Sequence, residues 1–363
     1  MKIQEQVALA PLTTMKVGGP ARYFVEAETS EDTREAIAFA RSRNLPFFVL
    51  GGGSNLVVAD AGFDGVVVKI ALRGIKEIGP HMPKGGRYGA PAATDAEDHL
   101  IFEVGAGQDW DNFVAHAVER DCAGLECLSG IPGTVGATPV QNVGAYGQEV
   151  AETIISVKAL EIESGRECGF TNTECGFAYR TSRFNTVDRG RFVILGVTFA
   201  LRPSGAPKIA YGDLKKCFAQ NARPTLAEVR DAVLAVRRGK GMVVANDDPD
   251  SRSAGSFFKN PMLSEAQFRD LEQRAGARGL TIPSYPALAS QHKVSAAWLI
   301  EQAGFPRGYA KGPVGISTKH TLAIVNRGGA KAADIIALKD EIQGGVRHQF
   351  GIELQPEPVF LGF

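Results

Sequence analysis

Residues 129–147, SGIPGTVGATPVQNVGAYG, are the segment of this chain whose residue types most restrict its chemistry. It combines two prolines with five glycines within 19 residues: Gly130, Gly133, Gly136, Gly144 and Gly147. Glycine allows positive φ and close approach to the backbone, whereas proline fixes φ and removes a donor. The segment suits a backbone pressed against a flat or phosphorylated ligand. A set of tight turns in a compact fold would use the same residues.

A second glycine segment, GGGSN at 51–55, directly follows the apolar residues Phe47 to Leu50. Successive backbone N–H groups in such a turn can form a nest that holds a pyrophosphate. It is not the dinucleotide-binding GxGxxG pattern, because Leu56-Val57-Val58 follows it instead of a helix. A glycine triplet alone is weak evidence for phosphate, and a second glycine-rich segment strengthens it.

The string AGSFFKNP at 254–261 offers a different chemistry. Ser256 has no neighbouring histidine in the sequence, so it does not have the signature of a triad nucleophile. A serine buried beside an electrophilic carbon could instead donate a proton. The alternative is a turn with a capping serine.

Several charged residues have both a functional and a surface interpretation. Arg180 and Arg183 could hold a carboxylate through bidentate hydrogen bonds, or form surface ion pairs. Near the end of the chain, Glu353, Gln355 and Glu357 alternate onto one face. Spacing leaves open whether Glu353 or Glu357 is the working carboxylate.

The stretch Asp247, Asp248 and Asp250 resembles part of a metal loop. Pro249 and the lack of an EF-hand glycine and glutamate favour a solvated acidic loop. The strings at 211–213 and 237–240 could contact phosphate or lie on an ordinary surface. We expect no metal site and assign no histidine as a ligand.

The elements that must position these residues follow from periodicity, caps and breakers. Strands are expected at 22–27, 47–50, 56–58, 65–70, 99–104 and 320–326, and an alternating segment at 352–360. Helices are expected at 30–43 with Ser30 as cap, 110–120 with Asp109 as cap, 226–238, 294–303 and 332–350. The apolar face of the third helix would be Leu226, Val229, Val233 and Val236. The Gly/Pro-rich residues 81–98 are expected to form a surface loop.

Composition limits the class of protein. At 363 residues, with 40 basic and 40 acidic side chains, the chain has room for two or three domains and no net charge. Neutrality argues against a nucleic-acid partner. Five cysteines without a CxxC pair indicate reduced thiols, and no apolar run suits a leader or a membrane span. We therefore expect a cytoplasmic protein with no membrane partner.

Taken together, the strings resemble those of the UDP-N-acetylenolpyruvoylglucosamine reductase family, from about Thr14 to the C-terminus. In order and spacing they are VLGGGSN (49–55), the glycine-rich run (129–147), YRTSRF (179–184), AGSFFKNP (254–261), AAWLIEQAGF (296–305) and QPEP (355–358). The YGDL string at 211–214 is similar to the tyrosine loop of the longer family type.

The resemblance implies an α+β fold class: an FAD-binding domain of the vanillyl-alcohol-oxidase (PCMH) type with a separate α+β substrate-binding domain. The implied boundaries are 1–212 for the FAD-binding region, in two α+β subdomains split near 70, and 213–345 for the substrate-binding domain. Residues 346–363 would be a C-terminal strand returning to the FAD domain and active site.

The resemblance also implies non-covalent FAD, with NADPH as co-substrate. Neither glycine segment contains a histidine to attach the flavin. The residues expected to bind FAD are Gly51, Gly52, Gly53, Ser54, Asn55, Ser129, Gly130, Ile131, Pro132, Gly133, Gly136, Ala137, Gln141, Asn142, Gly144, Ala145, Tyr146 and Gly147.

The implied reaction is NADPH-dependent reduction of UDP-N-acetylglucosamine enolpyruvate to UDP-N-acetylmuramate in peptidoglycan synthesis, and hence a role in cell wall biogenesis, cell shape and division. The family's catalytic set falls on Arg180, Ser256 and Glu357. Hydride would pass from NADPH to FAD N5 and then to the enolpyruvyl CH2 carbon. Ser256 would protonate the adjacent carbon, while Arg180 and Glu357 polarise the substrate carboxylate.

By the same resemblance Tyr211, Lys240 and Asn260 would bind the UDP and sugar portions. His320 stands where some relatives have glutamine, and its role stays open. One alternative is another FAD-dependent oxidoreductase of the same superfamily. A further one is a flavin- or nucleotide-sugar-binding protein without turnover. Intact catalytic motifs favour the reductase, which we expect to act as a monomer.

Overall fold

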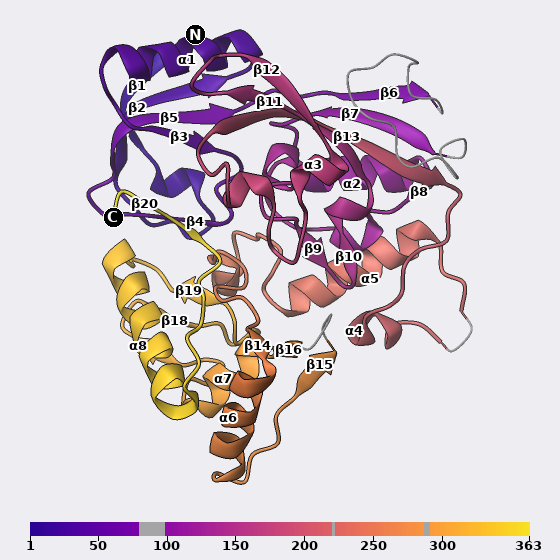
Figure 1. Ribbon diagram of the computed structural model, residues 1–363, viewed down its shortest axis with the longest axis vertical. Coiled ribbons are helices and arrows are strands. Elements are labelled where there is room, and N and C mark those ends of the chain that lie inside the picture. The colour runs from indigo at the N-terminus through magenta and orange to yellow at the C-terminus, as the bar shows by residue number, and fades with distance from the viewer. Residues whose placement is uncertain (80–98, 220–221, 287–290) are drawn as a thin grey trace. The chain divides into compact units, whose positions relative to one another are not determined.

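The computed structural model describes residues 1–79, 99–219, 222–286 and 291–363 (Figure 1). The chain forms two compact units. Unit 1 comprises Met1–Val7, Ala21–Gly52 and Asp64–Arg238, and unit 2 comprises Ala8–Pro20, Gly53–Phe63 and Gly239–Phe363. The loop expected at 81–98 lies outside the described residues. The glycine segment at 51–55 therefore begins in unit 1 and ends in unit 2.

Unit 1 starts with a four-stranded sheet in the order β1-β2-β5-β3. Its strands are β1 (Ile3–Ala8), β2 (Pro20–Ala27), β3 (Phe47–Leu50) and β5 (Phe63–Ile70), with β3 and β5 parallel. Helix α1 (Ser30–Ser42) connects β2 to β3. Its N-cap is Thr29 and not Ser30, because Thr29 and Asp32 form a reciprocal capping box.

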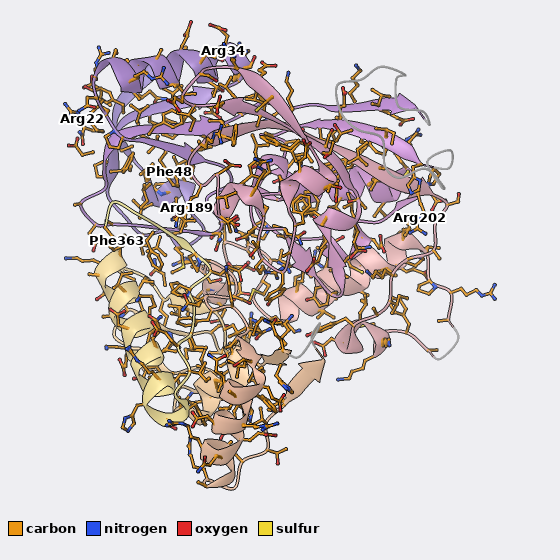
Figure 2. All side chains as sticks on the ribbon, in the orientation of Figure 1. Arg22, Arg34, Phe48, Arg189, Arg202 and Phe363 are labelled. Atoms are coloured by element: carbon orange, nitrogen blue, oxygen red, sulfur yellow. The ribbon has the colours of Figure 1, made fainter. Side chains whose placement is uncertain are left out.

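A second sheet of unit 1 has the order β12-β11-β13-β7-β6, and β8 pairs with β13. The strands are β6 (Ile75–Gly79), β7 (Leu100–Gly105), β8 (Cys122–Ala123), β11 (Ile154–Glu161), β12 (Glu167–Thr171) and β13 (Phe192–Pro203). Arg34 on α1, which is labelled in Figure 2, forms an ion pair with Glu167 on β12 at 2.7 Å and so links this helix to the second sheet.

Short elements and two longer helices complete unit 1. They are α2 (Trp110–Glu119), β9 (Gly144–Ala145), β10 (Gln148–Glu149), α3 (Asn172–Cys175), α4 (Gly212–Lys215) and α5 (Leu226–Gly239). Asp109 caps α2 as predicted, accepting the Asn112 N–H at 2.9 Å. On α5 the buried face ends on Arg237 and not on the predicted Val236. At about 100° per residue, Arg237 and Val236 lie at nearly equal angles on opposite sides of the face formed by Leu226, Val229 and Val233, so helical periodicity alone does not choose between them.

The described residues of unit 2 form three small sheets. They are β14 (Met262–Ser264), β16 (Gln291–Val294) and β15 (Ser284–Pro286); β17 (Ala310–Lys311), β18 (Val314–Ile316) and β19 (Ile324–Asn326); and β20 (Val359–Leu361) parallel to β4 (Leu56–Val58). Of the segment expected at 352–360, only its end enters a strand, although burial alternates from Ile352 to Gln355 as predicted.

The helices of unit 2 are α6 (Glu265–Gly276), α7 (Ala296–Gln302) and α8 (Ala332–Phe350). Helix α8 has the predicted bounds and buries its predicted stripe, Ile335, Leu338, Ile342, Val346 and Phe350. Helix α7 starts two residues later than expected, because Val294 belongs to β16 and Ser295 is the N-cap.

The strand predicted at 320–326 is shorter than expected. Residues before β19 form a turn in which the Ser317 hydroxyl oxygen accepts the N–H groups of Lys319 (3.0 Å) and His320 (3.2 Å). The turn closes with the Ala323 N–H donating to the His320 carbonyl at 3.1 Å. A serine side chain that binds backbone N–H groups competes with extended pairing. His320 therefore lies on a turn.

Each unit has its own apolar core. Trp110, Phe102, Phe113 and Phe199 are fully buried in unit 1, and Phe257, Phe258 and Phe350 in unit 2. All five cysteines are free, and burial raises the pKa of the Cys127 and Cys175 thiols to about 12. In the described ranges no helix has both the length and the apolar character to cross a bilayer. The same residues include no cluster of three His, Cys, Asp or Glu side chains arranged for a metal.

Candidate active site

In unit 1 the backbones of the two glycine-rich segments touch. A Cβ on Gly52 would lie 2.5 Å from the Gly133 Cα, and one on Gly51 would lie 3.0 Å from the Thr134 Oγ1. Gly133 has φ of +132° and Gly130 has φ of +70°, a region that favours glycine. The glycine-rich run thus contains sharp turns, and its backbone approaches that of Gly52 closely. The result is a surface of bare backbone, which fits a cofactor that binds through phosphates.

The start of α2 holds this surface in place. The Trp110 N–H donates to the Gly133 carbonyl at 3.1 Å, and the Trp110 indole N–H donates to the Leu128 carbonyl at 3.0 Å. On the other side of the turn, the Val135 N–H donates to Gln108 at 2.9 Å and the Gly136 N–H to Ala106 at 2.8 Å. These bonds fix residues 128–136 against a buried helix.

Asp111 on α2 links the glycine-rich run to α5. Its Oδ1 accepts the Gly130 N–H at 2.6 Å, and its carboxylate accepts two hydrogen bonds from Arg230, at 2.6 and 2.9 Å. Burial alone would raise the pKa of Asp111, but the bonds from Arg230 and Gly130 lower it overall. Buried Arg237 adds a second cation whose charge acts on Asp111. Residue patterns alone had not singled out Asp111.

Among the predicted FAD-binding residues, the side chains of Ser129 and Asn142 are already engaged within unit 1. The buried Ser129 hydroxyl donates to the Glu126 carbonyl at 2.7 Å. The Asn142 amide donates to Glu149 at 2.7 Å and to the Ala178 carbonyl at 3.0 Å, and accepts the Ala151 N–H at 3.2 Å. Any contact of these residues with a cofactor would therefore come from their backbone.

Gly130 is also buried, whereas the other expected cofactor residues of unit 1 are more open. Ala137 and Gly147 are exposed, and the half-buried ones are Gly51, Ile131, Pro132, Gly133, Gly136, Gln141, Gly144, Ala145 and Tyr146. Gly52 is exposed. The Tyr146 ring packs edge-on against Tyr211 with centroids 5.6 Å apart. Tyr211 is 49% exposed, so a predicted substrate residue stands beside the glycine-rich run with a free face.

The structure distinguishes Arg180 from Arg183. Arg183 donates to the buried Asp188 carboxylate at 2.6 Å, which is the ion-pair role. Arg180 donates to the Gly144 carbonyl at 2.8 Å and has φ of +55°, a strained value for a residue with a Cβ. Arg180 is therefore held beside the expected cofactor segment by a backbone conformation that Arg183 does not share.

In unit 2 the Ser256 and Glu357 segments are directly paired. The Glu357 N–H donates to the Phe257 carbonyl at 2.9 Å, and the Lys259 N–H donates to the Gln355 carbonyl at 2.9 Å. Ser256 and Glu357 are both half-buried, whereas Glu353 is exposed. Spacing left open whether Glu353 or Glu357 is the working carboxylate, and burial beside Ser256 favours Glu357.

The end of the first glycine segment joins this pair. The Asn55 amide donates to the Glu357 carbonyl at 3.2 Å, and the Val359 N–H donates to the Asn55 carbonyl at 3.0 Å. Gly53 has φ of +63°, and a Cβ there would lie 2.0 Å from the Leu12 carbonyl oxygen. Ser54 accepts a bond from Thr14 through its carbonyl at 3.3 Å.

The predicted substrate residues of unit 2 lie on separate segments. The Asn260 Oδ1 accepts the Ala296 N–H at 3.0 Å at the start of α7, and Lys240 is half-buried after α5. The acidic loop is partly built into the protein and not simply solvated. Asp250 is buried and accepts the Thr318 hydroxyl, and Asp248 accepts Lys319 at 2.8 Å, a contact that raises the pKa of Lys319.

His320 was left without a role by the sequence. Its Nε2 lies 3.5 Å from the Ser256 Oγ. The contact joins residues 64 positions apart, which no local pattern reveals. The catalytic residues expected from the sequence are thus divided: Arg180 belongs to unit 1, and Ser256 and Glu357 belong to unit 2.

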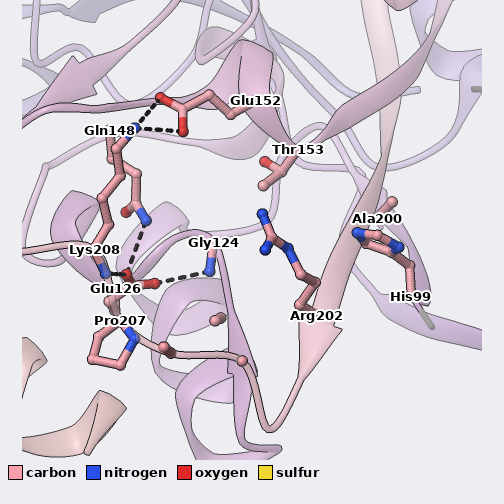
Figure 3. Close-up of a pocket in the computed structure, with 13 residues that line it drawn as sticks. His99, Gly124, Glu126, Gln148, Glu152, Thr153, Ala200, Arg202, Pro207 and Lys208 are labelled. Atoms are coloured by element: carbon pink, nitrogen blue, oxygen red, sulfur yellow. Dashed lines mark hydrogen bonds and ion pairs between the residues drawn. The ribbon is translucent and has the colours of Figure 1, made fainter. Parts of the chain in front are cut away.

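A cavity of about 370 Å³ lies in unit 1 (Figure 3). Figure 3 shows Arg202 with its guanidinium turned into the cavity, and Glu126 bonded to Gly124 and Gln148. Lys208 pairs with Glu152 on its rim at 2.8 Å. None of the lining residues is a predicted site residue.

Comparisons with known proteins cover both units. A family model described as the C-terminal domain of UDP-N-acetylenolpyruvoylglucosamine reductase matches residues 247–361, and one described as an FAD binding domain matches residues 21–168. The first range contains Ser256 and Glu357, and the second contains both glycine segments.

Relatives named UDP-N-acetylenolpyruvoylglucosamine reductase match nearly the whole chain. The one from Thermobifida fusca is 45% identical over 98% of this chain and 97% of its own, and the one from Saccharopolyspora erythraea is 46% identical over 98% and 94%. The solved structure of the Thermus caldophilus reductase has a TM-score of 0.64 at 25% identity and covers 99% of both chains. These findings confirm the expected fold class, an α+β protein with an FAD-binding domain and a separate α+β domain.

Proposed function

Because the chain belongs to the UDP-N-acetylenolpyruvoylglucosamine reductase family, we propose that it reduces UDP-N-acetylglucosamine enolpyruvate to UDP-N-acetylmuramate with NADPH. The match to an FAD binding domain makes it an FAD-dependent oxidoreductase. The observation that carries the proposal is the pairing of the Ser256 segment with the Glu357 segment in unit 2. It brings the hydroxyl of Ser256 and the carboxylate of Glu357, which are 101 positions apart in the sequence, onto adjacent backbones.

FAD would be held non-covalently by the bare backbone of Gly51, Gly52 and the glycine-rich run, with Gly53 to Asn55 completing the site. When bound, FAD would accept a hydride from NADPH and supply it to the enolpyruvyl CH2 carbon. The N–H groups of a glycine-rich turn can surround a pyrophosphate without side chains intervening. The contact between Gly52 and Gly133 supports this assignment.

Arg180 and Glu357 would act on the substrate carboxylate. Hydride addition to the CH2 carbon moves electron density toward the carbon bearing the carboxylate. A guanidinium held beside that group stabilises the charge as it develops. The fixed conformation of Arg180, bonded to the Gly144 carbonyl, supports such a preorganised role. Glu357, presented between Pro356 and Pro358, would orient the substrate.

Ser256 would give its hydroxyl proton to the carbon next to the CH2 group. The C=C bond is then reduced by one hydride and one proton, and the product is the lactyl ether. A serine hydroxyl is a poor acid, so it must be held close to the carbon and its alkoxide must be neutralised. Tyr211, Lys240 and Asn260 would bind the UDP and sugar portions. We further propose that the protein acts as a cytoplasmic monomer.

The flavin tests this proposal directly. The purified protein should be yellow, lose its colour with NADPH under anaerobic conditions, and regain it when UDP-N-acetylglucosamine enolpyruvate is added. A protein that stays colourless after reconstitution with FAD would refute it. A flavin that NADPH bleaches, but that this nucleotide sugar does not recolour, would favour the alternative of another FAD-dependent oxidoreductase.

A further inference from the structure

We propose that His320 is a positioning residue for proton transfer, which orients the Ser256 hydroxyl and replaces its proton as that proton passes to carbon. The inference rests on the proposed function, because it needs Ser256 to protonate a carbon. It assigns a role within unit 2 to a residue for which the sequence suggested none.

The geometry fixes both ends of the contact. His320 Nε2 and Ser256 Oγ are 3.5 Å apart, and both residues are half-buried. The Phe257 N–H donates to the Leu322 carbonyl at 2.7 Å, so the residue after Ser256 is bonded to the second residue after His320. The Ser317 hydroxyl holds the His320 N–H at 3.2 Å. The backbone therefore keeps the ring opposite the hydroxyl.

A distance of 3.5 Å is long for a hydrogen bond, but such contacts tighten when substrate is bound. The step itself is simple. As Ser256 gives its proton to carbon, its oxygen takes a proton from the His320 imidazolium. The N–H bond breaks, the O–H bond forms again, and the neutral imidazole recovers a proton from water. No electron is transferred in this step.

The charged groups on the surrounding segments are Arg252, Lys259, Asp248, Asp250, Glu301, Lys319 and Glu357. Asp248 pairs with Lys319, Asp250 accepts the Thr318 hydroxyl, and Glu301 accepts the Thr321 hydroxyl. Carboxyl, ammonium and guanidinium groups ordinarily titrate outside pH 6 to 8, whereas imidazole titrates within it. Of the side-chain types present around Ser256, the imidazole of histidine is therefore the one that can exchange a proton near neutrality.

Three variants separate proton return from mere positioning. His320→Gln keeps a nitrogen donor but cannot titrate, and His320→Ala removes both functions. His348→Gln is the matched control, because His348 is an exposed histidine on α8 of the same unit. Each variant is loaded with FAD and its melting temperature is compared with that of the wild type. Stopped-flow absorbance then measures flavin bleaching by NADPH and recolouring by UDP-N-acetylglucosamine enolpyruvate.

We expect the bleaching rate to be unchanged in all three variants. Recolouring should slow about 10²-fold in His320→Ala, the lower range for a lost proton-transfer partner. In His320→Gln it should slow less and become independent of pH between 6 and 8, while the wild-type rate falls as the imidazole loses its proton. Adding His320→Ala to Ser256→Ala should slow recolouring no further.

The outcomes are distinguishable. If wild-type flavin recolours and His320→Ala recolours at the same rate, the role of His320 is wrong and the proposed function stands. A pH profile of His320→Gln that matches the wild type would overturn proton return. If the wild-type flavin itself is not recoloured by the nucleotide sugar, both the proposed function and this inference fail.

Discussion

Replacing Gly52 by alanine tests whether the two glycine-rich backbones must touch for FAD to bind. The new Cβ would lie 2.5, 3.0 and 3.3 Å from the Gly133 Cα, C and N atoms. Ordinary contact begins at 3.4 Å, so the closest atom is about 0.9 Å too near. All three atoms belong to the backbone, and rotation of a side chain cannot relieve the overlap. The Gly133 segment must move, although Trp110 holds it by a hydrogen bond.

Such overpacking costs about 1–3 kcal/mol. If bound FAD opposes the movement, the cost is lost from cofactor binding, which weakens by roughly 5- to 150-fold at 1.4 kcal/mol per tenfold. The measurement is a titration of the apoprotein with FAD, followed by quenching of flavin fluorescence. The melting temperature of the apoprotein shows how much of the cost falls on folding instead.

Gly51→Ala is the matched control, one residue away. Its nearest atom is the Thr134 Oγ1 at 3.0 Å, which can rotate, and the next is the Ala137 Cβ at 3.5 Å. Neither Gly51 nor Gly52 has a positive φ, so alanine strains neither backbone. The control should bind FAD within about threefold of the wild type, an effect near 0.5 kcal/mol. Wild-type affinity in Gly52→Ala, or an equal loss in Gly51→Ala, would refute the reasoning.

Further predictions concern the catalytic residues and the support of the glycine-rich run. Ser256→Ala should leave bleaching by NADPH intact and slow recolouring by the enolpyruvyl nucleotide at least ~10²-fold; near-normal turnover would remove Ser256 from its role. Glu357→Gln should slow recolouring by more than about 10-fold, whereas the exposed Glu353→Gln should not, and equal effects would leave the choice of carboxylate unsupported. Asp111→Asn should lower the free energy of unfolding at pH 7 by on the order of 1 kcal/mol, as judged by urea denaturation. Because the pKa of Asp111 is lowered in the folded state, this difference should be full above pH 5 and shrink as pH falls below 4; a constant difference would show that the carboxylate charge is not responsible.

Local patterns predicted the elements that carry the site. The apolar run before GGGSN is β3, Asp109 caps α2, and the stripe on 332–350 is buried in α8. These succeed because a cap or a helical period depends on residues within one or two turns. The prediction of a helix at 226–238 was also correct. Its buried face was assigned from hydrophobicity, so Val236 was expected to be buried and Arg237 was not. The buried cation opposite Asp111 was missed for that reason.

Contacts between distant segments could not be predicted from spacing. The Gly130 N–H meets Asp111 across 19 residues, and Arg230 reaches the same carboxylate across 119 residues. An aspartate in the first turn of a helix ordinarily indicates a favourable interaction with the helix dipole. Only the fold shows that this one also binds the glycine-rich run.

The sequence pattern around Ser256 does not reveal which way its side chain points. Alternation normally reveals which residues of an extended segment face the core, but Phe257 and Phe258 are 0% and 1% exposed. Both sides of the segment are therefore buried at this point, and the pattern does not say where Ser256 points. Its direction is set by register, through the bonds of Phe257 to Leu322 on one side and to Glu357 on the other. A slip of one residue would reverse every side chain. The contact of Ser256 with His320 and its pairing beside Glu357 thus depend on the same two hydrogen bonds.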